Sequence, residues 1–264
     1  MLSMLSPLWL YRGFIMGNVR REIQSRYQNS LLGAAWVFIN PLAMIVVYTV
    51  IFSQVMGAKL PGVDSTFSYS IYLCAGVITW GLFADITGRA QNVFIDHANL
   101  LKKLTFPRLC LPVIVVINAS LNFLVIFGLF TVFLLITGNF PGLVALALIP
   151  LLLLQILFAI GLGISLAVLN VFFRDVGQLF SVMLQFWFWL TPIVYPVSIL
   201  PETVRPFMNL NPMASLVAGY QTILVNQQWP VWQDLWFVSL LALILLILGL
   251  KLFRKHAGDM VDEL

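Results

Sequence analysis

The sequence contains little charge. Only 9% of its 264 residues are Asp, Glu, Lys or Arg, whereas 61% are hydrophobic. A soluble domain is closer to a quarter charged and half apolar. A soluble protein of this composition lacks enough polar side chains to cover its surface, but in a bilayer the outer surface is itself apolar. We therefore expect an all-α integral membrane protein.

Groups that carry chemistry are also scarce. There are two cysteines, Cys74 and Cys110, and their wide separation favours two buried apolar side chains over a disulfide or a metal site. The sequence has no Gly-x-Ser-x-Gly, no His-Glu-x-x-His and no Gly-x-x-x-x-Gly-Lys motif, so it has no recognisable nucleophile, zinc site or phosphate loop. We expect no catalytic residue, no metal ligand and no cofactor on this chain.

The long apolar stretches contain almost no ionisable residue. Asp85 is the nearest candidate for a functional group inside the membrane, where a charge costs about 2.5–3.5 kcal/mol. Arg89 lies four residues later, which favours a plain ion pair on the helix surface. A pump requires buried carboxylates, and a membrane-embedded glycan or lipid transferase requires a polar cluster. Both are disfavoured, and the transferase stays an alternative.

What the chain does have is long uncharged stretches. A helix of about 20 residues crosses the roughly 30 Å of hydrocarbon. The turn residues at 137–142 divide the longest stretch into a helical hairpin. The sequence therefore predicts six transmembrane helices, at residues 32–52, 70–87, 111–136, 142–171, 178–195 and 235–252.

The basic residues give these spans an orientation. With six crossings, twelve of the 14 Lys and Arg residues fall on the side of the two termini. Only Lys59 and Arg205 fall on the other side. Because positive residues concentrate in cytosolic loops, we expect both termini in the cytosol.

Two segments are not predicted to cross. Residues 8–27 mix apolar residues with arginines at helical spacing, which predicts an amphipathic helix at the cytosolic interface; a frayed basic tail is the alternative. In 201–226, Asn211-Pro212 resembles an N-cap followed by proline at the first helical position. A crossing here would place the basic residues near the C-terminus outside the cell, so we expect external, re-entrant helices.

Aromatic residues are abundant, with 21 Phe, 8 Trp and 7 Tyr. Packing or an interfacial belt is the simpler interpretation for any one of them. Others can line a path for sugars, whose C–H faces stack on aromatic rings. The candidates for a pore lining are Trp36, Tyr48, Phe52, Trp80, Phe186 and Trp187.

Several segments together resemble permeases of type-2 ABC exporters, in particular the branch that exports O-antigen, capsule and teichoic acid. The similarity follows the whole chain, 1–264, as a single permease domain. It is carried by Arg21-Glu22-Ile23-x-x-Arg26-Tyr27-x-x-Ser30-x-Leu32-Gly33-x-x-Trp36, Asn40-Pro41-Leu42, Leu100-x-Lys102-Lys103-x-x-Phe106-Pro107-Arg108, Phe172-Phe173-Arg174-Asp175-Val176, Thr191-Pro192-Ile193-x-Tyr195, Leu200-Pro201 and Asn211-Pro212.

The resemblance implies a channel-forming subunit of the bacterial inner membrane. It implies a homodimer that binds two copies of an ATPase on separate chains, which would hold the ATP and Mg²⁺. The substrate would be an undecaprenyl-type lipid-linked polysaccharide, with membrane lipids around the protein and no nucleic acid. A type-2 permease for a drug or another lipid is the alternative.

The resemblance also implies roles for individual residues. Residues 97–108 would contain the element that docks on the ATPase. Arginines of the interfacial helix would guide the lipid diphosphate, with plain positive-inside charge as the alternative. Pro201, Asn211 and Pro212 would belong to an outer gate. The docking residues are Leu100, Leu101, Lys102, Lys103, Phe106 and Arg108, and the arginines are Arg20, Arg21 and Arg26.

Overall fold

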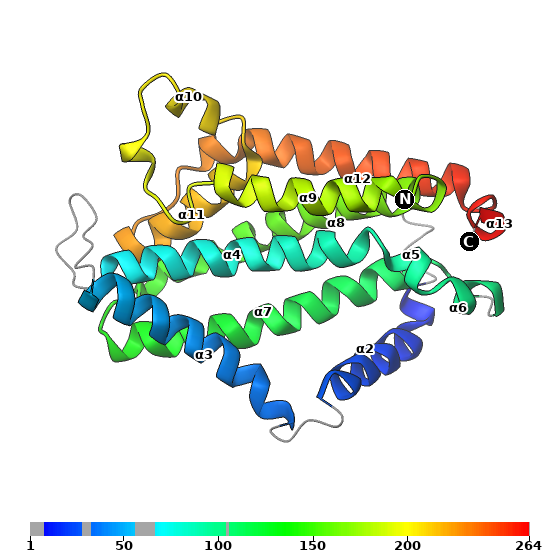
Figure 1. Ribbon diagram of the computed structural model, residues 1–264, viewed down its shortest axis with the longest axis horizontal. Helices are drawn as coiled ribbons and strands as arrows, with labels where there is room; N and C mark the ends of the chain where they lie inside the picture. Colours follow the sequence, from blue (N-terminus) through cyan, green and yellow to red (C-terminus); the bar gives the residue numbers. More distant parts are fainter. Residues whose placement is uncertain (1–7, 28–32, 56–66, 104–105, 264) are drawn as a thin grey trace.

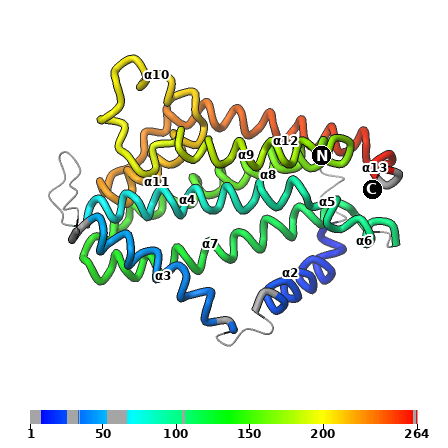
Figure 2. Tube along the Cα trace, viewed as in Figure 1, coloured from blue at the N-terminus to red at the C-terminus, as the bar shows by residue number. Residues whose placement is uncertain are grey.

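In a computed structural model, the structure describes residues 8–27, 33–55, 67–103 and 106–263. Over these residues the regular structure is entirely helical, as expected. The long helices lie side by side along one axis, with α3 and α7 on one side, α12 on the other, and α4, α8 and α9 between them (Figures 1 and 2). The helices are α2 (Arg12–Tyr27), α3 (Trp36–Tyr48), α4 (Ser68–Ala90), α5 (Val93–Asp96), α6 (Ala98–Lys103), α7 (Cys110–Ile136), α8 (Leu148–Phe172), α9 (Asp175–Leu190), α10 (Arg205–Met208), α11 (Pro212–Asn226), α12 (Trp236–His256) and α13 (Met260–Glu263).

The two ends of the bundle differ. The short helices α5, α6 and α13 lie together at one end, whereas α10 and α11 lie at the other (Figure 1). We call the first the α6 end and the second the α10 end.

Within the described residues, four helices are long and apolar enough to cross a membrane. They agree with four predicted spans to within a few residues at most ends. Trp36–Phe52 is apolar but shorter, and α3 continues at its C-terminal end as a π-helix, Thr49–Val55. The four long segments are Ser68–Ala90, Cys110–Ile136, Gly142–Phe172 and Trp232–His256.

The helix α9 differs from the predicted span 178–195. It begins earlier, at Asp175, whose carboxylate suits the positive end of a helix dipole. It ends five residues before the predicted Tyr195, because Thr191 is extended, with φ −100° and ψ 134°. The cause is Pro192, which disfavours the α conformation in the residue before it. The helix is therefore 16 residues long.

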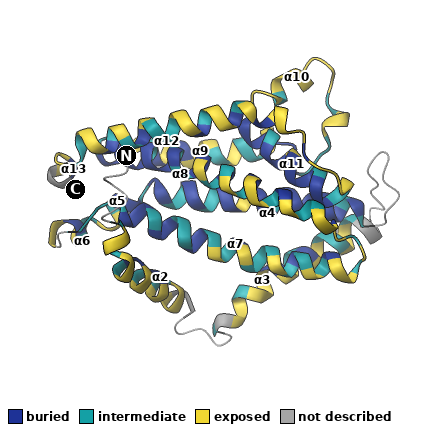
Figure 3. Cartoon of the chain, turned by 180° about the vertical axis from the view of Figure 1, so that it is seen from behind, coloured by how far each residue is buried: buried dark blue, intermediate teal, exposed yellow. Residues whose placement is uncertain are grey.

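The core of the bundle surrounds α4. In its apolar segment 72% of residues are buried, against 22% in those of α7 and α12, and Figure 3 shows the same contrast between these helices. The helices α8 and α12 approach closely at glycines. A Cβ on Gly161 would lie 2.7 Å from the backbone nitrogen of Leu246, and one on Gly249 would lie 2.9 Å from Oγ of Ser165. Small residues of this kind let membrane helices pack backbone to backbone.

Candidate functional site

Aromatic rings join α9 to the core of the bundle. Trp80 of α4 is only 8% exposed, and its ring meets Trp187 of α9 edge-on, with centroids 6.2 Å apart. Trp187 also contacts Phe83 at 5.3 Å, and Phe83 stacks on Phe158 of α8 at 5.4 Å. Such pairs contribute about 0.5–1.5 kcal/mol beyond their buried area. The cluster fixes one face of α9 against α4 and α8.

The opposite face of α9 is apolar and open. Of the predicted pore aromatics, Trp80 lies in the core, Trp187 lies between the core and this face, and Phe186 is 66% exposed on it. A groove of 690 Å³ follows this face. It is lined by Asp175, Gln178, Leu179, Val182, Met183, Phe186, Trp187 and Leu190.

The other three predicted pore aromatics lie on α3 and its π-helical continuation. Tyr48 is half-buried, and its ring meets Phe52 at 6.3 Å. Phe52 stacks on Tyr69 of α4 at 5.3 Å. Trp36 begins α3 at the far end and is 40% exposed. The structure thus brings Tyr48 and Phe52 together at the start of α4, and the pore-lining role of all six stays a prediction.

Side chains of α4 bond the backbone that follows α9. The hydroxyl of Tyr72 lies 2.9 Å from the carbonyl oxygens of both Pro192 and Tyr195 and shares its single proton between them. Tyr69 Oη donates to the carbonyl of Val194 at 2.8 Å. Backbone carbonyls that lie away from water require such partners. Sequence reasoning missed both tyrosines, although two tyrosines three residues apart near the end of an uncharged stretch were a signal.

Asn211 connects the start of α11 to α9. Its Oδ1 accepts a hydrogen bond from the backbone N–H of Met213 at 3.1 Å, and Pro212 occupies the first turn, which confirms the predicted N-cap. The same oxygen accepts a bond from Nε1 of Trp187 at 2.8 Å. Its Nδ2 donates to the hydroxyl of Thr191 at 3.1 Å. A predicted gate residue and a predicted pore aromatic are therefore in direct contact.

Pro201 lies in the exposed loop between α9 and α11. Arg205 organises this loop by donating to the carbonyl of Leu200 at 3.0 Å and to that of Ser198 at 2.8 Å. The assignment of Pro201, Asn211 and Pro212 to an outer gate stays a prediction.

The predicted docking segment, 97–108, contains the helix α6, and the short helix α5 comes directly before it. Leu101 is 8% exposed and packs in one cluster with Met260 of α13, a contribution from the C-terminus that the sequence did not indicate. Lys102 and Lys103 are exposed. One apolar side chain thus anchors the segment while two charges face outward. The other predicted docking residues are half-buried: Leu100, Phe106 and Arg108.

Helix α2, for which an interfacial position was predicted, contacts both this segment and α7. The ring of Phe14 lies 4.9 Å from that of Phe106. Ile15 and Val19 are buried against the first turns of α7. Helix α2 is therefore packed on the bundle over its first half.

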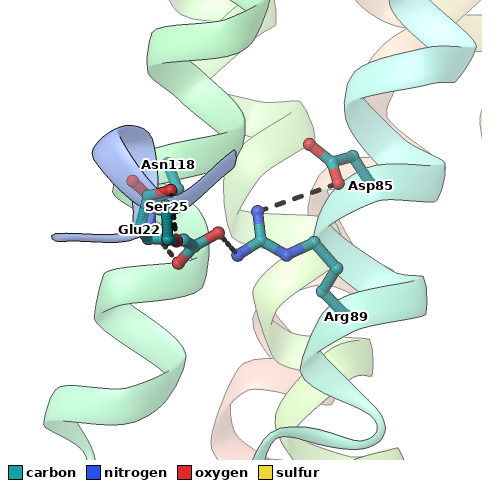
Figure 4. A network of polar contacts seen from close by, with 5 residues as sticks. All are labelled: Glu22, Ser25, Asp85, Arg89 and Asn118. Atoms are coloured by element: carbon teal, nitrogen blue, oxygen red, sulfur yellow. Dashed lines mark hydrogen bonds and ion pairs between the residues drawn. The ribbon is translucent and has the colours of Figure 1, made fainter. Parts of the chain in front are cut away.

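Glu22 forms a charged contact from the second half of α2 (Figure 4). Its carboxylate pairs with Nη2 of Arg89 and accepts a hydrogen bond from Nδ2 of Asn118 in α7. Arg89 also lies 4.0 Å from Asp85, so the expected ion pair is present but is not its shortest contact. Sequence reasoning missed Glu22 and Asn118. The signal was that Glu22 is the only acidic residue within 8–27.

The structure describes the side chains of two of the three arginines predicted to bind the diphosphate. Arg20 and Arg21 are exposed on α2, and the side chain of Arg26 lies outside the described residues. Their role stays a prediction.

Asn170 joins three helix ends at the α6 end. It donates to the carbonyl of Gln91 at 3.0 Å and to Oδ1 of Asn92 at 2.9 Å. Its own Oδ1 accepts from the backbone N–H of Gly177 at 2.8 Å. The contact fixes the C-terminal end of α4 to α8 and to the first turn of α9, and a buried asparagine in an apolar stretch was its only sequence signal.

Both cysteines are free and buried, as predicted. Among the described residues, no group of three or more His, Cys, Asp or Glu side chains is arranged to hold a metal ion.

Comparison with known proteins identifies the family. Residues 14–225 match the family described as ABC-2 type transporter. The chain is 30% identical over 266 residues to the O-antigen export system permease protein RfbA of Myxococcus xanthus, covering all of both chains. It is 31% identical over 239 residues to a protein of the same name from Klebsiella pneumoniae, covering 89% of this chain and 88% of that one. It is 20% identical over 244 residues to the polysialic acid transport protein KpsM of Escherichia coli, covering 92% and 93%.

The family match extends from α2 almost to the end of α11, and therefore includes the aromatic cluster, the contacts of Asn211 and the helices α5 and α6. The apolar helices agree with a membrane-embedded protein. The chain belongs to the ABC-2 type transporter family, as a transport permease embedded in the membrane.

Proposed function

We propose that this permease is the channel-forming subunit of an exporter for lipid-linked polysaccharide of the O-antigen type. The observation that carries the proposal is the similarity along the full length of the chain to a protein named as an O-antigen export permease. The bacterial inner membrane is then its location.

Six crossings are the membrane arrangement that we propose. The four long helices would be joined by α3 with its π-helix and by α9. Helix α9, with 16 residues, is about 24 Å long, short of the hydrocarbon thickness. The extended segment 191–195 would supply the remaining length of this crossing. Its carbonyls accept hydrogen bonds from the tyrosines of α4. The positive-inside rule then places the α6 end and both termini in the cytosol. Residues 201–226 remain external or re-entrant.

A homodimer with its pore at the interface would use the open face of α9. The groove on this face has Asp175 and Gln178 at its cytosolic end and Phe186 and Trp187 farther along. Polar groups followed by aromatic rings suit a glycan, whose hydroxyls form hydrogen bonds and whose C–H faces stack on rings.

Energy would come from two ATPase subunits, which hold the ATP and Mg²⁺. Lys102 and Lys103 are exposed beside the buried Leu101, so a partner with carboxylates can bind them without disturbing the anchor. Arg20, Arg21 and Arg26 would guide the diphosphate of an undecaprenyl-type lipid carrier, because arginine binds phosphate oxygens in pairs.

A deletion strain tests the proposal. We expect loss of the gene to remove the polysaccharide from the cell surface and to leave it in the cytosol, and the restored gene to reverse both effects. The purified permease should also bring an ATP-hydrolysing subunit with it. Normal surface polysaccharide in the deletion strain would favour a drug or lipid permease instead.

A further inference from the structure

Arg89 lies near the end of α4, a short distance along the chain before the proposed docking segment, 97–108. It is in the last turn of α4, which ends at Ala90, and α5 begins at Val93. The turn between them is fixed, because Asn170 bonds the carbonyl of Gln91 and the side chain of Asn92. A displacement of α5 and α6 is therefore transmitted to Arg89 through a short, rigid connection.

Glu22 lies in α2, a part of the chain far from Arg89 in sequence, and α2 is followed by a different helix, α3. Helix α2 precedes α3, the proposed first crossing, so Glu22 and Arg89 are 67 positions apart in sequence. Their contact joins α4, which comes before the docking segment, to the helix that precedes α3. Asn118 of α7 holds the second oxygen of the Glu22 carboxylate, which fixes its orientation (Figure 4).

The two halves of α2 are held by different forces. The first half packs through Phe14, Ile15 and Val19, and such apolar contacts have no preferred direction. The second half is held by the charged pair, whose strength depends on distance and hydrogen-bond geometry. The Arg89 and Glu22 side chains are 28% and 32% exposed, so water can replace either partner when the pair separates.

Space for movement lies beside the pair. A cavity of 100 Å³ separates α2, the start of α3 and α7 at this point. It is lined by Glu22, Ile23, Val37, Asn118, Leu121, Asn122 and Val125.

We propose that Glu22 and Arg89 are positioning residues for export, through which movement of the docking segment is transmitted to α2 and α3. The inference rests on the proposed function. Neither residue contacts substrate in this mechanism. Their pairing sets the position of the second half of α2 according to the state of the ATPase.

Substitutions of the pair test this in the permease–ATPase complex. We expect Glu22→Gln and Arg89→Gln each to lower export about tenfold, within the usual range of coupling between sites. Assembly with the ATPase and basal ATP hydrolysis should stay within about twofold of the unchanged protein. The double variant should be no worse than the poorer single variant, since both remove the same contact. Gln24→Ala, at an exposed position of the same helix, is the control and should export normally.

A cross-link reports the movement with the pair intact. Cysteines at Ile23 and Leu121, which line the cavity from α2 and α7, are introduced with Cys74 and Cys110 replaced by alanine. With copper-phenanthroline as oxidant, we expect the yield of the 23–121 disulfide to change several-fold with a non-hydrolysable ATP analogue. Adding Glu22→Gln should remove this dependence.

The outcomes separate the possibilities. Normal export by both single variants overturns the proposal, as do losses that multiply in the double variant. A cross-link yield that is the same with and without the ATP analogue also overturns it. Collapse of assembly together with export would make the pair a structural contact only and also overturns it. Failure of the proposed function would appear differently, as a deletion strain whose surface polysaccharide is unchanged.

Discussion

The indole nitrogen of Trp187 donates a hydrogen bond of 2.8 Å to the side-chain oxygen of Asn211. The bond connects α9, which has a groove on one face and an aromatic cluster on the other, to the first turn of α11. Because the same oxygen caps α11, the start of one helix and the position of the other depend on a single side chain.

Asn211→Ala therefore removes a helix cap and a tertiary contact together. Loss of an N-cap costs about 1 kcal/mol, and the unpaired indole adds a comparable amount. Trp187→Phe keeps the cap of α11 but removes the indole N–H together with part of the ring packing against Trp80 and Phe83, so it should also destabilise the protein. Thermal unfolding of the purified permease measures both. Asn209→Ala, in the exposed loop, is the control, and an Asn211→Ala protein as stable as this control would contradict the prediction.

The tyrosines of α4 offer a graded comparison. Tyr72→Phe removes the hydroxyl that bonds the carbonyl of Tyr195 and the nearer of two donors to that of Pro192, which Gln221 also reaches at 3.4 Å. We therefore expect a loss of about 1–3 kcal/mol, and a smaller loss for Tyr69→Phe, whose hydroxyl bonds one carbonyl. Tyr220 supplies the matched control, because its hydroxyl is buried and has no hydrogen-bond partner in the described part of the chain. Tyr220→Phe should be neutral or stabilising in the same unfolding assay. Equal losses at all three positions would show that the carbonyls are not the cause.

The packing of α8 on α12 should not tolerate larger residues. Gly161→Ala places a Cβ 2.7 Å from the backbone of α12, so the helices must separate, and overpacking of this kind costs about 1–3 kcal/mol. Gly128→Ala is the control, since a Cβ on Gly128 in α7 meets nothing within 4 Å and alanine is the better helix former. If both variants unfold at the same temperature, the close approach of the helices is wrong.

The exposed lysines of α6 should govern binding of the ATPase. We expect Lys102→Glu with Lys103→Glu to reduce the amount of ATPase that co-purifies by about tenfold, and binding of the unchanged protein to weaken as salt increases. Lys255→Glu reverses another exposed charge, in the last turn of α12, and should have little effect. Undiminished co-purification of the double variant would place the docking surface elsewhere.

Local patterns predicted most of the fold. Charge-free stretches located the four long helices, and Asn211-Pro212 located the start of α11, because span length and capping depend on neighbouring residues. The predicted span ended at Tyr195, but α9 ends at Leu190. The difference arises because Pro192 forces Thr191, the residue before it, out of the helical conformation. Glu22 with Arg89, Asn170 with Gly177, and the tyrosine bonds to the 192–195 backbone were also missed. Each joins residues on different elements, and one sequence without its fold does not indicate which polar groups meet.

The burial of α4 has a consequence for biosynthesis. It is the least apolar of the four long helices and the one most completely surrounded by protein. Insertion machinery that reads apolarity will recognise it least readily. Its final partners α8 and α11 are synthesised much later than α4 itself. The ribosome therefore completes α4, at the centre of the bundle, before it synthesises α8 and α11. Until these helices are inserted, α4 must be surrounded by lipid or bound by a chaperone.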